Sequence, residues 1–297
     1  MRIDALLAFV AVAETGSFGA AALRLHLSQP AVSKRLAGLE ARLGHRLLDR
    51  TGREVDLTEA GQAYLPHARQ TIAALADGDR ALDNLSERIE GQLDIALSHH
   101  VGMHRMPAVL RRFVARYPAV SPQISFADSE LACAQVVNGE SELAVITLPV
   151  TPHPRLIALP IWHDPLDIYV GNAHALAGRE TVTADELARH AAVLPPPESY
   201  TFAIVASAFA SAGAVPRPRM TSHSLETLRM LADVGLGWTV LPRAMPNALT
   251  PLAVPGVTMA RTLGVMRHPQ RTLSNAARAL VAMLETEATE IAAGLDN

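Results

Sequence analysis

The chain has 297 residues, of which 49% are hydrophobic, and a formal net charge of −3 at pH 7. This length allows two domains, and the composition excludes a disordered chain. A single cysteine, Cys133, excludes an internal disulfide and a metal site built on paired cysteines. No apolar run reaches the ~18 residues of a membrane helix, and the first residues do not resemble a secretory signal, so we expect a cytoplasmic protein.

The front of the chain predicts three short helices, of which the last two form a helix-turn-helix. Apolar residues at helical spacing indicate a buried helix over residues 4–14. Ser17 is a good N-cap for a second helix over Phe18–Leu25, and Ser28 caps a third. Pro30 falls in the first turn of that third helix, where no intrahelical hydrogen bond is lost, so the helix begins sharply.

The leading turn of the third helix is predicted to contact DNA. In a helix-turn-helix the second helix enters the major groove with its N-terminal residues toward the base edges. Gln29 suits a bidentate pair with adenine, and Ser33 and Lys34 lie one turn further on a similar face. From Arg24 to Arg53 the chain carries seven basic residues against two acidic ones, a local charge of +5. This stretch predicts double-stranded DNA as a partner.

A small β-wing is expected after the third helix, because Val55 and Leu57 alternate with polar neighbours around a glycine turn. Arg50 and Arg53 would reach phosphate or the minor groove. The alternative interpretation is capping and solvent exposure on the helix, and simple surface charge on the wing. The candidate DNA-binding residues are Ser28, Gln29, Pro30, Ser33, Lys34, Arg50 and Arg53.

Thr58 caps a long predicted helix over about residues 59–90. Its apolar residues recur at spacings of three and four and form one seam, with breaks at Asp79 and Ser86. Pro66 should bend this helix. A single long helix with one apolar seam needs a partner, and the simplest partner is the same helix of a second copy.

From Gln92 onward, short apolar runs alternate with helical patterns, which indicates an α/β architecture with a mostly parallel sheet. The alternation occurs twice in series, and two such units place a ligand cleft between them. The expected strands of the first unit are 93–97, 124–127, 143–148 and 168–170, and its helices are 106–117 and 131–138. The expected strands of the second unit are 192–194, 219–221 and 237–241, and its helices are 202–212 and 225–233.

The front of the chain closely resembles the LysR-type transcriptional regulators. The resemblance is carried by residues 8–61, which read AFVAVAETGSFGAAALRLHLSQPAVSKRLAGLEARLGHRLLDRTGREVDLTEAG. It continues more weakly in RYP at 116–118, ELAV at 142–145 and VGLGWTVLP at 234–242. Two departures are Lys34, where the family often has arginine, and Leu48, where phenylalanine is frequent.

The resemblance implies an α/β fold class with an N-terminal winged helix-turn-helix and a two-lobed effector domain of two α/β subdomains, like the periplasmic binding proteins. The implied domains are a DNA-binding domain over 1–58, a dimerisation helix over 59–90 and an effector-binding domain over 91–297. The first lobe would comprise about 91–162 and 266–297, and the second about 163–265. The implied partners are promoter DNA, further copies in dimers or tetramers, RNA polymerase and a small-molecule effector, with no cofactor.

The candidate effector-binding residues follow strand ends and precede helices in the rear domain. At such places exposed N–H groups and a helix dipole favour an anion, and the family places its ligand-binding loops there. Capping and core polar groups are the alternative explanation. The candidates are Ser98, His99, His100, Thr147, Tyr200, Thr201 and His223.

Other chemistries fit the sequence less well. His99, His100 and His104 suggest zinc, but no nearby carboxylate or thiol is evident in the sequence, so no metal site is expected. The chain lacks a G-x-S-x-G elbow, a Walker loop and a dinucleotide fingerprint, so no enzyme activity is expected. We expect a sequence-specific DNA-binding regulator gated by a small molecule. The alternative is a small-solute-binding protein without a gene-regulatory role.

Overall fold

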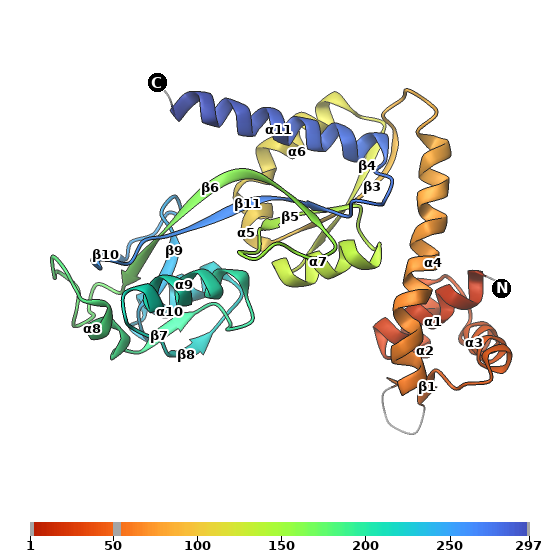
Figure 1. The fold of residues 1–297 in the computed structure, drawn as a ribbon, viewed down its shortest axis with the longest axis horizontal. Coiled ribbons are helices and arrows are strands. Elements are labelled where there is room, and N and C mark those ends of the chain that lie inside the picture. The colour runs from red at the N-terminus through yellow and green to blue at the C-terminus, as the bar shows by residue number, and fades with distance from the viewer. Residues whose placement is uncertain (1–2, 50–54, 296–297) are drawn as a thin grey trace. The chain divides into compact units, whose positions relative to one another are not determined.

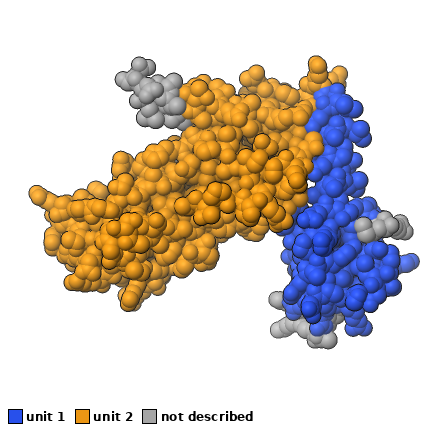
Figure 2. All heavy atoms as spheres, in the orientation of Figure 1, with its two compact units in different colours: residues 1–86, 138–140 blue, residues 87–137, 141–297 orange. Residues whose placement is uncertain are grey.

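The computed structural model describes residues 3–49 and 55–295, with the backbone alone for 291–295. The chain forms two compact units, residues 1–86 with 138–140 and residues 87–137 with 141–297 (Figure 2). Each unit has apolar clusters of its own.

In the first unit, the structure confirms the predicted helix-turn-helix (Figure 1). The turn between its two helices includes His26, which takes a positive φ of 53°. The next two strands pair antiparallel, with Leu48 opposite Leu57, and form the base of the expected wing. The elements are α1 (Ile3–Thr15), α2 (Phe18–Arg24), α3 (Gln29–Leu43), β1 (Leu48–Asp49), β2 (Asp56–Leu57) and α4 (Glu59–Asp83).

Hydroxyl side chains begin three of these helices, at the positions that the sequence indicates. Ser17, Ser28 and Thr58 each accept a hydrogen bond from the backbone N–H three residues on, at 3.4, 3.4 and 3.0 Å. Each cap satisfies a donor that has no intrahelical partner. Gly44 ends α3 in the left-handed conformation, with a φ of 69° that favours glycine.

The core of the first unit lies between α1 and α3. Leu6, Phe9 and Val12 on α1 and Leu36 and Leu39 on α3 are almost completely buried. These positions follow the helical spacing of apolar residues in the sequence, so the exposed side of α3 carries its polar residues.

α4 ends at Asp83, earlier than the predicted end near residue 90. Asn84 caps it, and the backbone N–H of Ser86 donates to the carbonyl of Asp83 at 3.1 Å, which closes a turn. Asparagine and serine favour caps and turns because their side chains compete for backbone hydrogen bonds. Further on, Ile89 packs against an apolar cluster of the second unit.

The second unit contains two groups of elements, which we call the first and second lobes. The first lobe contains β3 (Gly91–Leu97), α5 (His99–His104), α6 (Met106–Arg116), β4 (Val120–Phe126), α7 (Ser129–Asn138), β5 (Leu143–Thr147) and α11 (Asn275–Leu295). The second lobe contains α8 (Ala184–Ala188), β7 (Ala192–Leu194), α9 (Tyr200–Ser211), β8 (Pro218–Thr221), α10 (Leu225–Asp233), β9 (Thr239–Pro242) and β10 (Thr250–Leu252). Two long strands, β6 (Ile157–Val170) and β11 (Met259–Arg267), run through both lobes (Figure 1).

The expectation of a mostly parallel sheet is wrong. Among the described residues, seven strands form one mixed sheet in the order β10-β6-β11-β5-β3-β4, with β9 also paired to β6. β3 is parallel to β4 and to β5, whereas the other pairings of this sheet are antiparallel. The cause is the β6–β11 pair, which the short apolar runs in the sequence did not reveal. A separate parallel pair, β7 with β8, lies in the second lobe.

One buried polar pair interrupts the apolar face of β6 and β11. Along β6 the buried residues Trp162, Asp164 and Leu166 alternate with more exposed ones, and Trp162 and Leu166 belong to the clusters of different lobes. Asp164 lies directly opposite Arg261 of β11 in the strand register. This polar pair therefore separates the apolar clusters of the two lobes along β6 and β11.

Candidate functional site

The leading edge of α3 is open to solvent. Ser28, Gln29, Pro30 and Lys34 are exposed, and Ser33 is half-buried. The first turn of α3 carries no acidic residue that would repel phosphate. The exposure and charge of these side chains are what a contact with a duplex requires, so all five stay candidates for DNA contact. Arg50 and Arg53 lie outside the described residues.

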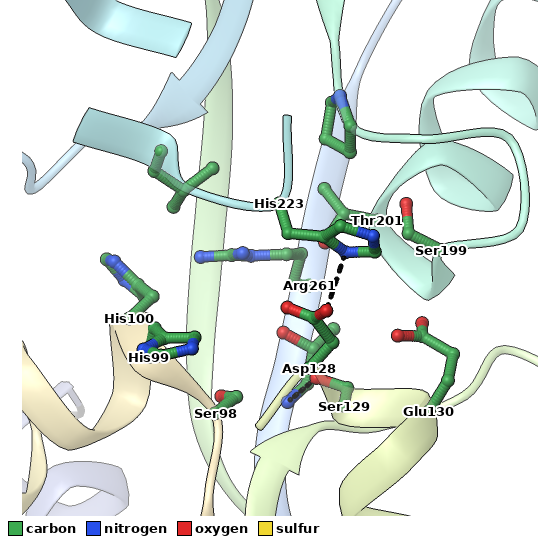
Figure 3. Close-up of a pocket in the computed structure, with 13 residues that line it drawn as sticks. Ser98, His99, His100, Asp128, Ser129, Glu130, Ser199, Thr201, His223 and Arg261 are labelled. Atoms are coloured by element: carbon green, nitrogen blue, oxygen red, sulfur yellow. Dashed lines mark hydrogen bonds and ion pairs between the residues drawn. The ribbon is translucent and has the colours of Figure 1, made fainter. Parts of the chain in front are cut away.

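A cavity of about 50 Å³ lies between the two lobes of the second unit (Figure 3). Six of the seven predicted effector residues line it, which are Ser98, His99, His100, Thr147, Thr201 and His223. The sequence did not single out the other lining residues, which are Asp128, Ser129, Glu130, Pro195, Ser199, Leu225 and Arg261. The strand ends and helix starts of both lobes therefore converge on this cavity.

Tyr200 is the predicted residue that does not line the cavity. Its ring packs against an apolar cluster of the first lobe that includes Cys133. Burial raises the pKa of the Tyr200 hydroxyl and of the Cys133 thiol, so both stay protonated. Tyr200 therefore stays a prediction: its backbone N–H donates to Glu130, which lines the cavity, while its side chain packs outside the lining.

The floor of the cavity is a buried charge network. Arg261 is 3% exposed, and its Nε and Nη2 donate to Oδ2 of Asp164 at 3.0 and 2.5 Å. Arg105 Nη2 donates to the other carboxylate oxygen at 3.3 Å. His100 Nε2 lies 4.0 Å from Asp164. Two arginines thus hold one carboxylate that is 1% exposed.

His100 is neutral in this network. Burial, followed by the positive charge of Arg261, lowers the pKa of its imidazole to about 3. Its Nδ1 atom is buried and makes no hydrogen bond within the described residues. A ligand atom that reached Nδ1 would satisfy this group, whose burial without a partner is unfavourable.

Three polar contacts join the lobes around the cavity. His223 Nδ1 of the second lobe lies 3.2 Å from Oδ2 of Asp128 in the first lobe, as Figure 3 shows. The backbone N–H of Tyr200, at the start of α9, donates to Oε1 of Glu130 at 2.5 Å. His104 Nε2 lies 3.2 Å from Oε1 of Glu226. The lobes are therefore connected by side chains as well as by β6 and β11.

Signals for some of the missed residues were present in the sequence. The expected strand 124–127 is directly followed by Asp128, Ser129 and Glu130. Ser98 was chosen as a candidate because it follows an expected strand in the same way. Ser129 Oγ accepts a hydrogen bond from the backbone N–H of Thr147 at 3.3 Å, which links the start of α7 to the end of β5. Arg261 had no such signal, because its strand was not predicted.

No group of three or more histidine, cysteine or acidic side chains is placed to hold a metal ion in residues 3–49 and 55–290. The rings of His100 and His104 lie 4.7 Å apart between centroids, but they are not part of any such group among these residues. In the same part of the chain, no helix has the length and apolar character needed to span a membrane.

A winged helix-turn-helix followed by two α/β lobes around a polar cavity defines a ligand-responsive transcriptional regulator. Two family models match this chain and leave little of it uncovered. Residues 3–62 match the bacterial regulatory helix-turn-helix protein of the lysR family, and residues 86–289 match the LysR substrate binding domain. The chain belongs to the LysR family of transcriptional regulators.

Similar proteins support this assignment along the whole chain. A probable RuBisCO transcriptional regulator of Synechocystis is 30% identical, over 94% of this chain and 84% of its own length. A helix-turn-helix-type transcriptional regulator of Azotobacter vinelandii is 58% identical over 107 residues, which are 36% of this chain and 74% of that one. The fold is similar to a full-length variant of OxyR from Pseudomonas aeruginosa, with a TM-score of 0.68, 20% identity and coverage of 97% and 94% of the two chains. CbnR, a LysR family regulator, gives a TM-score of 0.64 at 23% identity, with coverage of 97% and 99%.

Proposed function

We propose that a small molecule bound in the cavity between the lobes controls how this regulator acts at promoter DNA. The observation that carries the proposal is the convergence of polar side chains from both lobes on one cavity, with Ser98 and Thr147 on one side and Thr201 and His223 on the other. A ligand that contacts both lobes favours one relative arrangement of them. Such a ligand changes DNA binding only if the arrangement of the lobes is coupled to the positions of the DNA-binding units.

DNA recognition is assigned to the leading edge of α3 and the wing. Gln29 and Ser33 face base edges, Lys34 contacts phosphate or base, and Arg50 and Arg53 contact the neighbouring backbone or minor groove. The exposure of Gln29 and Lys34 supports this assignment. The boundaries 1–58, 59–90 and 91–297 are proposed as the functional domains.

Self-association is part of the proposal. Leu75 and Leu82 of α4 are 52% and 68% exposed in the single chain, although both belong to the predicted apolar seam. Pairing of α4 with the same helix of a second copy would cover them, and a dimer would place two winged units on two half-sites. Tetramers, contact with RNA polymerase, a cytoplasmic location and the absence of enzyme activity complete the proposal.

The test is a mobility-shift titration of the full chain with DNA from upstream of its own gene, across a range of salt concentrations. We expect specific retardation, and Gln29→Ala should lower the preference for the specific site by about 1–3 kcal/mol. Gln70→Ala is the matched control, since Gln70 is also an exposed helical glutamine. Cavity ligands that bind without any specific DNA retardation would instead favour a solute-binding protein with no regulatory role.

A further inference from the structure

The cavity offers little uncompensated positive charge to a ligand. Among the described residues, Arg261 is the only arginine or lysine in its lining. Its guanidinium is 3% exposed and donates twice to Asp164. His100 is neutral at physiological pH, because burial lowers its pKa to about 3. An entering carboxylate would therefore lose its hydration without gaining a free guanidinium as a partner.

The helix N-termini of the second lobe that face the cavity are capped by oxygens of the chain itself. At the start of α9, Ser199 Oγ accepts from the N–H of Phe202 at 3.1 Å, and Glu130 Oε1 accepts from the N–H of Tyr200 at 2.5 Å. At the start of α10, Ser224 Oγ accepts from the N–H of Thr227 at 3.2 Å. Such N–H groups attract anions when they are free. Here oxygens of the chain itself accept from the N–H groups of Tyr200, Phe202 and Thr227.

Negative charge, in contrast, is presented to the cavity. Asp128 and Glu130 both line it, and in Figure 3 their carboxylates face Ser199, Thr201 and His223 of the second lobe. The Asp128 side chain is 35% exposed, with His223 on one of its oxygens. A carboxylate has two oxygens with about four acceptor positions, so both groups keep the capacity to accept from a ligand.

We propose that the effector carries an ammonium group, which Asp128 and Glu130 bind, and that the cavity discriminates against carboxylates of the same size. The hydroxyls of Ser98, Thr147 and Thr201 would bind the polar remainder of the molecule. The volume of about 50 Å³ sets the scale of suitable probes, because a cavity that holds benzene has ~150 Å³. This inference rests on the proposed role of the cavity as the effector site.

The experiment compares three probes of similar size on the full chain by isothermal titration calorimetry: ethanolamine, glycolate and ethylene glycol. They share a hydroxyl group and differ in carrying an ammonium, a carboxylate or a second hydroxyl. We expect ethanolamine to bind at least about tenfold more tightly than the other two, as one charge-assisted hydrogen bond requires. Binding of glycolate at equal or higher affinity would overturn the proposal, and so would the absence of ethanolamine binding.

Two variants test the residues. Asp128→Asn and Glu130→Gln remove the charge but keep a carbonyl oxygen that accepts from His223 or from the N–H of Tyr200, so the contacts between the lobes persist. Each is expected to weaken ethanolamine binding about tenfold. The matched controls Asp185→Asn and Glu180→Gln change exposed acids outside the cavity and should leave the affinity for ethanolamine unaltered. Unchanged ethanolamine affinity in both cavity variants would refute the proposal.

The same preparations are used in the mobility-shift titration, so that two kinds of failure can be told apart. If specific DNA binding is present and responds to glycolate but not to ethanolamine, the ammonium inference is overturned and the proposed function stands. If ethanolamine binds through Asp128 and Glu130 but no specific DNA binding occurs, the ammonium inference stands as a statement about the cavity. The proposed regulatory function is then refuted.

Discussion

Neutralising Asp164 tests the interpretation of the cavity floor most directly. In Asp164→Asn, the guanidinium of Arg261 stays buried but loses its counter-ion, and Arg105 loses a charged acceptor. The new amide also presents an N–H₂ group to positively charged neighbours, and a buried group of that kind needs an acceptor.

The expected cost follows from burial. Asp164 is 1% exposed and Arg261 is 3% exposed, so solvent screens their interaction very little. Removal of one partner of such a pair costs about 3–5 kcal/mol, because the remaining charge is uncompensated. For a unit of ~200 residues, 1 kcal/mol shifts the melting temperature by about 2–4 °C, so Asp164→Asn should lower it by about 6–20 °C.

The assay is differential scanning calorimetry of the full chain, with a matched control from the same strand. Asp167 pairs with Arg243 at 2.8 and 2.9 Å, but 67% of the Arg243 side chain is exposed, so Asp167→Asn should barely move the transition. The double variant Asp164→Leu with Arg261→Met should recover most of the loss, because apolar groups of similar size replace a buried pair with little penalty. A decrease of less than ~2 °C for Asp164→Asn, or an equal decrease for Asp167→Asn, would refute the reasoning.

Three further predictions address pH, salt and backbone packing. His100 has a folded-state pKa of about 3, below the ~6.5 of the unfolded chain. As the pH decreases from 6.5 toward 3, the unfolded state binds a proton that the folded state does not, so the free energy of unfolding decreases. His100→Gln should remove up to about 1.4 kcal/mol of that loss per pH unit. Urea unfolding of the wild-type chain and the variant at pH 6.5 and 5 would measure the difference, and an equal loss of stability in both would contradict the prediction. Lys34→Ala should reduce the slope of log affinity against log salt by about 1 in the mobility-shift titration, and an unchanged slope would remove Lys34 from the phosphate contacts. On α4, a Cβ added at Gly61 would lie 2.0 Å from the carbonyl oxygen of Leu47, whereas one at Gly78 meets nothing within 4 Å. In thermal unfolding, Gly61→Ala should therefore destabilise by about 1–3 kcal/mol, and Gly78→Ala should stabilise by about 0.5–1 kcal/mol; effects of the same sign would contradict the local packing.

The parts of the fold that depend on near neighbours in the chain could be predicted from the sequence. Ser17, Ser28 and Thr58 begin helices because each hydroxyl reaches an N–H three residues on, and that relation is visible in the sequence alone. The end of α4 was harder to place, since the apolar seam continued past Asp83 while Asn84 favoured a cap.

The parts that depend on strand pairing could not be predicted in this way. Asp164 and Arg261 are 97 residues apart in the sequence, and only the register of β6 and β11 places them opposite each other. The cavity could be located because strand ends converge at one edge of a sheet. Which side chains enter it was less certain, as Tyr200 and Glu130 illustrate: the first turns to Cys133, and the second was overlooked.

Lys34, exposed on α3, is the only lysine in the sequence, since the other basic side chains of fixed charge are arginines. Amine-selective acylating reagents therefore have one side-chain target in this chain, besides the α-amino group. A fluorophore or cross-linker attached there would report on the recognition helix without engineered labelling sites. Protection of this single amine by bound duplex could be followed by mass spectrometry of the unaltered protein.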